Sequence, residues 1–137
     1  MSNSKTLTFV LMDAPFESAR TATAFRLIQT ALAHGHAVNV FAYEGAVALA
    51  FAQQKAHPNA VHGCDAQQEN HPLPSNWITQ LIADAAARGS RLDWVNCGLC
   101  VDERGVNEAV AGTRRGSPAD LWKMAQASDN TLVIATK

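Results

Sequence analysis

The sequence has few cysteines and no long apolar run. Its three cysteines, Cys64, Cys97 and Cys100, are odd in number and too few for a disulfide scaffold, which is consistent with a reducing compartment. No apolar stretch approaches the roughly 20 residues of a membrane helix, and the first fifteen residues lack the charged start and cleavage site of a signal peptide. We therefore expect a cytoplasmic protein without membrane contacts.

The sequence also has almost no net charge. Eleven basic and twelve acidic residues leave a net charge of −1, so there is no electrostatic reason to expect nucleic acid as a partner. Several catalytic patterns are missing as well: the Gly-x-Ser-x-Gly elbow, the Walker lysine loop, the dinucleotide glycine fingerprint and His-Glu-x-x-His. These absences exclude the commonest hydrolase, nucleotide-binding and zinc-protease signatures.

Apolar residues, by contrast, make up 47% of the 137 residues, enough for a packed core. We expect a single domain over residues 1–137. Short apolar runs bounded by turn residues predict strands at 6–12, 37–43, 91–96 and 131–135. Helical spacing and end signals predict helices at 17–34, 46–54, 76–88 and 119–127.

Several residues mark the ends of these elements. Ser75 is the expected N-cap of the third helix, and Ser117 with Pro118 that of the last. Residues 57–75 show no periodicity and read as one long loop, and 112–118 (GTRRGSP) as a turn. Strands alternating with helices predict an α/β fold, a doubly wound, mostly parallel sheet flanked by helices.

The informative position is Cys97, at the carboxyl end of the third predicted strand, where ligands and reactive groups gather in parallel sheets. With Cys100 it forms a C-x-x-C pair, which fits a dithiol switch, half of a metal site, a sulfur-carrying cysteine with a neighbour, or two small packed hydrophobes. Arg104 would favour the thiolate, whereas Asp102 and Glu103 would oppose it. We expect a partly exposed site.

The metal reading is the weakest of these. A structural zinc needs about four ligands, and there is no second C-x-x-C. Cys64 with His57, His62 and His71 could complete a site only from an irregular loop, where solvated histidines are the simpler interpretation. In a thioredoxin-like oxidoreductase the pair follows the first strand and opens a long helix, whereas here it follows the third predicted strand and the next helix is short. We therefore expect no metal.

Other polar and aromatic residues have plainer interpretations. Asp13 and Glu44 follow the first two strands and are candidates for a polar rim, although such residues often only cap strand ends. Trp77, Trp94 and Trp122 have apolar neighbours and are expected to pack in the core or in an interface.

Three features together resemble the DsrE/DsrF-like family. They are the first strand ending in Met12-Asp13-Ala14-Pro15, the turn Phe41-Ala42-Tyr43-Glu44-Gly45, and Cys97 placed ahead of Arg104-Gly105. The resemblance covers the whole chain in its order of elements. It implies a flavodoxin-like sheet, assembly into homotrimers or hexamers, sometimes with related subunits, and sulfur donor and acceptor proteins as partners.

In that family the cysteine matching Cys97 accepts sulfane sulfur as a persulfide and passes it to a partner thiol, without a cofactor. This sequence differs from the sulfur-relay subunits by carrying Cys100. That residue could resolve a Cys97 persulfide by forming a disulfide. Three hypotheses follow: a sulfur carrier using Cys97, Cys100 and Arg104, a dithiol switch or reductase, and a non-enzymatic interaction module.

Overall fold

A computed structural model describes residues 3–58, 61, 63–69 and 72–136 of the chain. The strands of this part are β1 Thr6–Leu11, β2 Ala37–Ala42, β3 Leu92–Cys97, β4 Thr113–Gly116 and β5 Asn130–Ile134. The helices are α1 Arg20–Ala33, the 3-10 helix η1 Glu44–Ala50, α2 Ala66–Glu69, α3 Pro74–Ala87, α4 Gly98–Arg104 and α5 Pro118–Ala127.

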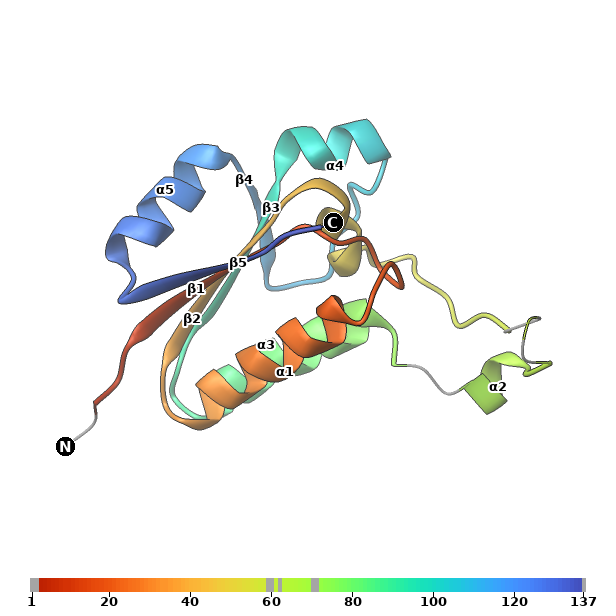
Figure 1. The fold of residues 1–137 in the computed structure, drawn as a ribbon, viewed down its shortest axis with the longest axis horizontal. Coiled ribbons are helices and arrows are strands. Elements are labelled where there is room, and N and C mark those ends of the chain that lie inside the picture. The colour runs from red at the N-terminus through yellow and green to blue at the C-terminus, as the bar shows by residue number, and fades with distance from the viewer. Residues whose placement is uncertain (1–2, 59–60, 62, 70–71, 137) are drawn as a thin grey trace.

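The five strands form one parallel sheet in the order β4-β3-β2-β1-β5. Helices α1 and α3 lie together on one face and α5 on the other, while α4 lies at the carboxyl end of β3, packed against η1 (Figure 1). The predicted doubly wound α/β architecture is confirmed, although this strand order differs from the 2-1-3-4-5 order of flavodoxin itself. The order reverses between β1 and β5, which places the switch point beside the end of β1.

The core lies between the sheet and the pair α1 and α3. Trp94 of β3 is fully buried, and Phe25 of α1 contacts both Trp94 and Trp77 edge-on, with ring centroids 6.0 and 4.8 Å apart. The expected packing role therefore holds for these two tryptophans. Trp122 on α5 is different, because 66% of it is exposed.

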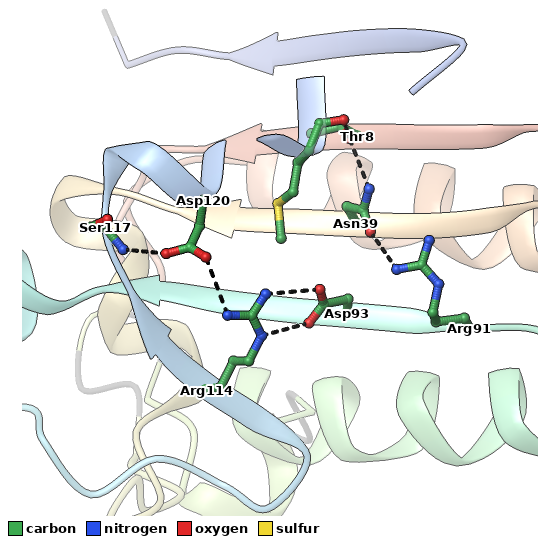
Figure 2. A network of polar contacts seen from close by, with 8 residues as sticks. Thr8, Asn39, Arg91, Asp93, Arg114, Ser117 and Asp120 are labelled. Carbon is green, nitrogen blue, oxygen red and sulfur yellow. Dashed lines mark hydrogen bonds and ion pairs between the residues drawn. The ribbon is translucent and has the colours of Figure 1, made fainter. Parts of the chain in front are cut away.

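Strand β4 corrects the prediction of a turn at 112–118. Its residues contain no apolar side chain, so hydrophobic pattern could not reveal it. Arg114 instead binds Asp93 of β3 through Nε and Nη2, both at 3.1 Å, and reaches Asp120 of α5 at 3.4 Å (Figure 2). Charge pairing thus stabilises an edge strand whose exposed arginines also discourage further strand addition.

A second part of the polar network crosses the same face of the sheet (Figure 2). Arg91 donates to the Asn39 amide oxygen at 2.9 Å, and the Asn39 amide nitrogen donates to the Thr8 hydroxyl at 3.2 Å. Thr8 and Asn39 are buried, so these bonds satisfy polar groups that water does not reach. The network therefore links β1, β2 and the start of β3 in one register.

Two helices begin at residues other than those predicted. Helix α3 begins at Pro74 with Leu73 as its N-cap, whereas Ser75 is buried inside the first turn, so the expected Ser75 cap is wrong. Proline at the first helical position explains this start. Helix α1 begins at Arg20, three residues later than predicted, because Phe16 adopts a left-handed φ of 64° and the Ser18 hydroxyl accepts the Arg20 N–H.

The remaining boundaries differ less. The second predicted helix is the 3-10 helix η1, which ends at Ala50 rather than at 54, and the predicted loop 57–75 contains the short helix α2. Ser117 is the N-cap of α5 as expected, and its N–H donates to the Asp120 carboxylate at 2.8 Å. No helix in the described part of the chain is long and apolar enough to cross a membrane.

Candidate functional site

The candidate site lies where the carboxyl ends of β1, β2 and β3 meet. Cys97 is the last residue of β3 and the N-cap of α4, so the sequence brings a thiol to the edge at which parallel sheets present reactive groups. Cys100 lies three residues on, in the first turn of α4. The predicted position of the cysteine pair is therefore the one that the structure has.

Both thiols are reduced and buried. Cys97 is 3% exposed and Cys100 6%, which corrects the expectation of a partly exposed site. Burial raises the pKa of the Cys100 thiol, and a hydrogen bond with Cys97 raises it further, while the N–H of Glu44, 3.3 Å from Sγ, acts in the opposite direction. Cys100 is therefore held as a protonated thiol that can donate a hydrogen bond to the Cys97 sulfur.

Glu44 connects the end of β2 to this pair. Its backbone adopts a left-handed φ of 53°, which is uncommon for a residue with a side chain. This conformation accompanies two contacts, because the Glu44 N–H points at Cys100 and its carboxylate binds Arg104 at 2.8 Å. Strain of this kind persists where surrounding contacts fix it, commonly at functional sites.

Arg104 therefore contacts Glu44 rather than a sulfur atom. Its Nη2 binds the Glu44 carboxylate and its Nη1 donates to the Cys100 carbonyl at 3.4 Å. The expected support of the Cys97 thiolate by Arg104 stays a prediction. The other charges named in the sequence also separate, since Glu103 is 3.7 Å from Arg104 and Asp102 binds a different arginine.

That arginine is Arg115 of β4, a site residue that the sequence analysis missed. Its guanidinium binds both Asp102 oxygens, at 2.8 and 2.6 Å, and lies directly over Gly98, where an added Cβ would be 2.7 Å from Nε. The Asp102 hydrogen bonds raise the pKa of Arg115 most, and the charge of a Cys97 thiolate contributes to the same shift. Arg115 is thus the guanidinium that can stabilise negative charge on Cys97.

The pairing of β3 with β4 explains this placement. Cys97 lies opposite Gly116, and Arg115 lies opposite Asn96, so the arginine is next to the end of β3. The sequence signal was the basic pair Arg114-Arg115 followed by glycine. It could be interpreted only once β4 was known to be a strand.

Tyr43 is a second residue that the sequence analysis did not assign. It follows Ala42, the residue of β2 that lies opposite Asn96. The Glu44 carboxylate raises the pKa of Tyr43 most, and the charges of Cys100 and Cys97 add to this shift. The phenol therefore stays protonated at neutral pH and can serve as a hydrogen-bond donor.

A metal site finds little support in the described residues. In the ranges 3–58, 61, 63–69 and 72–136, no group of three or more cysteine, histidine, aspartate or glutamate side chains could hold a metal ion. Cys64 is half-buried, and two of the histidines considered with it, His62 and His71, lie outside the described residues.

Comparisons with known proteins agree with the arrangement described above. Residues 5–134 match the model of the DsrE/DsrF-like family. The chain is 28% identical over 129 residues to the uncharacterised protein MJ0989 of Methanocaldococcus jannaschii, covering 93% of this chain and 97% of that protein. It also resembles the crystal structure of the YchN protein from E. coli, with a TM-score of 0.73 at 17% identity, covering 95% and 99% of the two chains. Because the family model spans nearly all of the sequence, the chain belongs to the DsrE/DsrF-like family.

Proposed function

We propose that this protein is a cytoplasmic sulfur-relay protein that carries sulfane sulfur as a persulfide on Cys97 and passes it to a partner thiol. Membership of the DsrE/DsrF-like family implies sulfur relay in general. The observation that carries the finer proposal is the position of Cys97, at the carboxyl end of β3, with Cys100 in the next helical turn and Arg115 over the adjacent Gly98. A reducing compartment keeps its thiol available.

Loading is a thiolate displacement. The Cys97 thiolate attacks the outer sulfur of a donor R–S–SH, a new S–S bond forms on Cys97, the S–S bond of the donor breaks, and R–S⁻ leaves. The outer sulfur keeps its oxidation state, so neither a redox partner nor a cofactor is needed. Unloading repeats the same displacement, with the thiolate of the acceptor protein attacking the outer sulfur on Cys97.

The surrounding residues have distinct roles in this proposal. Arg115 stabilises the negative charge on Cys97 before attack and on the persulfide afterwards. Cys100 donates a hydrogen bond to that sulfur, the Tyr43 phenol is hydrogen-bonded to Glu44, and Arg104 holds Glu44 against the Cys100 segment. Because both thiols are buried, the protein must open locally around Cys97 before a donor or acceptor protein can reach it.

A second candidate function rests on the hydrogen bond between the two cysteines. In a dithiol switch, the Cys100 thiolate attacks the inner sulfur of a Cys97 persulfide, a Cys97–Cys100 disulfide forms and HS⁻ leaves. The raised pKa of Cys100 slows this step at neutral pH, which favours the carrier over the switch. Assembly into homotrimers or hexamers, or with related subunits, belongs to the proposal in either case.

Intact mass spectrometry after incubation with inorganic polysulfide tests these functions. The carrier predicts that the wild type gains the mass of one sulfur atom, that Cys97→Ser abolishes this gain, and that the matched control Cys64→Ser retains it. The switch predicts loss of two hydrogens with sulfide release, and trapping of the added sulfur in Cys100→Ser. An unchanged mass in every variant contradicts both functions and leaves the interaction module.

A further inference from the structure

A cavity of about 750 Å³ opens at the carboxyl edge of the sheet. Asp13 after β1, Glu44 and Gly45 after β2, and Arg104 of α4 contribute to its wall. Its volume falls in the range of small-molecule sites, and it lies beside the switch point between β1 and β5, where ligands bind in open α/β sheets. The cavity therefore has the size and position of a ligand site.

A close approach between two loops shapes one side of this cavity. At Gly45 an added Cβ would lie 2.9 Å from the Cβ of Ala14 and 3.0 Å from its backbone nitrogen. Only glycine lets the segment after β2 pack this tightly against the segment after β1. Because Ala14 and Gly45 both line the cavity, this contact fixes the distance between its two loop walls.

The charged groups of the wall are of both signs. Asp13, Glu17 and Glu44 supply carboxylates, and Arg20 and Arg104 supply guanidinium groups. Such a lining favours a ligand that carries a cationic and an anionic group close together, because each end then meets opposite charge. Arg20 already pairs with Asp13 at 3.1 Å and Arg104 with Glu44 at 2.8 Å, so a ligand with charges of both signs keeps the wall balanced, whereas a singly charged ligand does not.

Asp13 is the most deeply placed of these groups. It is 4% exposed, and its Oδ2 accepts hydrogen bonds from the Ser18 hydroxyl and from Arg20 Nε, the latter at 3.1 Å. Its other oxygen, Oδ1, is buried and receives no hydrogen bond from the residues that the structure describes. Because this oxygen is enclosed, its negative charge acts on a ligand in the cavity through the electrostatic field rather than through a hydrogen bond, which favours an ammonium group at this end.

The opposite wall adjoins the cysteine pair. Glu44 and Arg104, joined at 2.8 Å, both line the cavity, and both also contact Cys100, through the N–H to Sγ and through Nη1 to the carbonyl. One ion pair thus separates the cavity from Cys100. A ligand bound here would lie on the Cys100 side of the cysteine pair.

We propose that this cavity binds a free α-amino acid that bears sulfur, of the cysteine persulfide class, as a small-molecule sulfur donor. Its ammonium group faces the carboxylates of Asp13 and Glu17, and its carboxylate faces Arg20 and Arg104. This inference rests on the sulfur-relay function proposed above. It adds a small molecule to the protein partners expected for the family.

Calorimetric titration of the full chain under reducing conditions tests the binding, with L-cysteine, cysteamine and 3-mercaptopropionate as probes. L-cysteine should bind saturably, and each of the other two about tenfold or more weakly, because each lacks one charged group. Glu17→Gln and Arg104→Gln should weaken L-cysteine binding, whereas Glu108→Gln and Arg88→Gln, outside the cavity wall, should not. Equal binding of all three probes, or no saturable binding at millimolar concentration, overturns the proposal.

Sulfur loading separates this inference from the proposed function. If inorganic polysulfide loads Cys97 but L-cysteine does not bind, the relay stands and the amino-acid site is wrong. If L-cysteine binds with the expected selectivity but no persulfide forms on Cys97 from polysulfide or from cysteine persulfide, the ligand site stands and its role as a donor site is wrong.

Discussion

The left-handed backbone of Glu44 makes a sharp test of how the site is built. Glu44→Gly and Glu44→Ala both remove the carboxylate that binds Arg104, but only glycine adopts a φ of 53° without steric cost. Neither variant removes the N–H that points at Cys100. The two variants therefore differ in backbone strain and in the freedom of the unfolded chain at this position.

The expected magnitudes follow from these contacts. Loss of the half-exposed ion pair with Arg104 costs about 0.2–1 kcal/mol in both variants. The left-handed conformation costs a residue with a Cβ about 1–2 kcal/mol, which glycine avoids, while glycine loses part of this gain through the greater freedom of its unfolded chain. Glu44→Gly should therefore be about 1 kcal/mol more stable than Glu44→Ala.

Urea unfolding of the two variants and the wild type, at one protein concentration, measures this difference, which corresponds to about 3 °C in Tm for a domain of this size. Glu44→Gly should equal or exceed the wild type, and Glu44→Ala should lie below it. Equal stabilities for the glycine and alanine variants would show that the backbone at position 44 is not strained. Backbone strain at Glu44 would then no longer support a functional site here.

Three further perturbations test other contacts. The Ser18 hydrogen bond holds the pKa of the Asp13 carboxyl below its usual value, with a contribution from Arg20, so its stabilisation is present above the unfolded pKa and is lost as pH falls through the folded one. Unfolding free energies measured from neutral pH into the acid range should fall more steeply for wild type than for Asp13→Asn, and parallel curves would contradict this. Burial raises the pKa of Cys100, so in a chain whose other two cysteines are serine, alkylation by iodoacetamide should need more alkaline pH when folded than in urea; coincident profiles would be the contrary result. Gly98→Ala should leave the chain folded but displace Arg115 and slow persulfide loading, and an unchanged loading rate would show that Arg115 does not act on Cys97.

Hydrophobic pattern was enough to locate most of the sheet. The runs that became β1, β2 and β5 are apolar enough to be recognised locally, and the rule that ligands gather at carboxyl strand ends placed Cys97 correctly. Strand β4 was missed because its stability comes from Arg114 pairing with residues of β3 and α5, contacts that do not appear in the local sequence.

The site was predictable in position but not in its charge partners. Nearness in sequence suggested that Arg104 serves Cys97, whereas the fold turns Arg104 to Glu44, sixty residues away in the chain, and brings Arg115 over Gly98 instead. The exposure of the thiols was also beyond local pattern, because burial depends on how η1 and α4 pack together at the end of the sheet.

In the proposed sulfur relay, burial of Cys97 also governs which thiols could remove the sulfur from it. A sulfur that is 3% exposed exchanges only during local opening, so its reaction rate scales with the open fraction. An opening free energy of about 2.7 kcal/mol would expose it in about one molecule in a hundred and slow attack by small cellular thiols by the same factor. A docked partner that stabilises the open form would escape this penalty. The enclosed thiol would then act as a kinetic filter that keeps sulfur from diffusing reductants while releasing it to a bound acceptor.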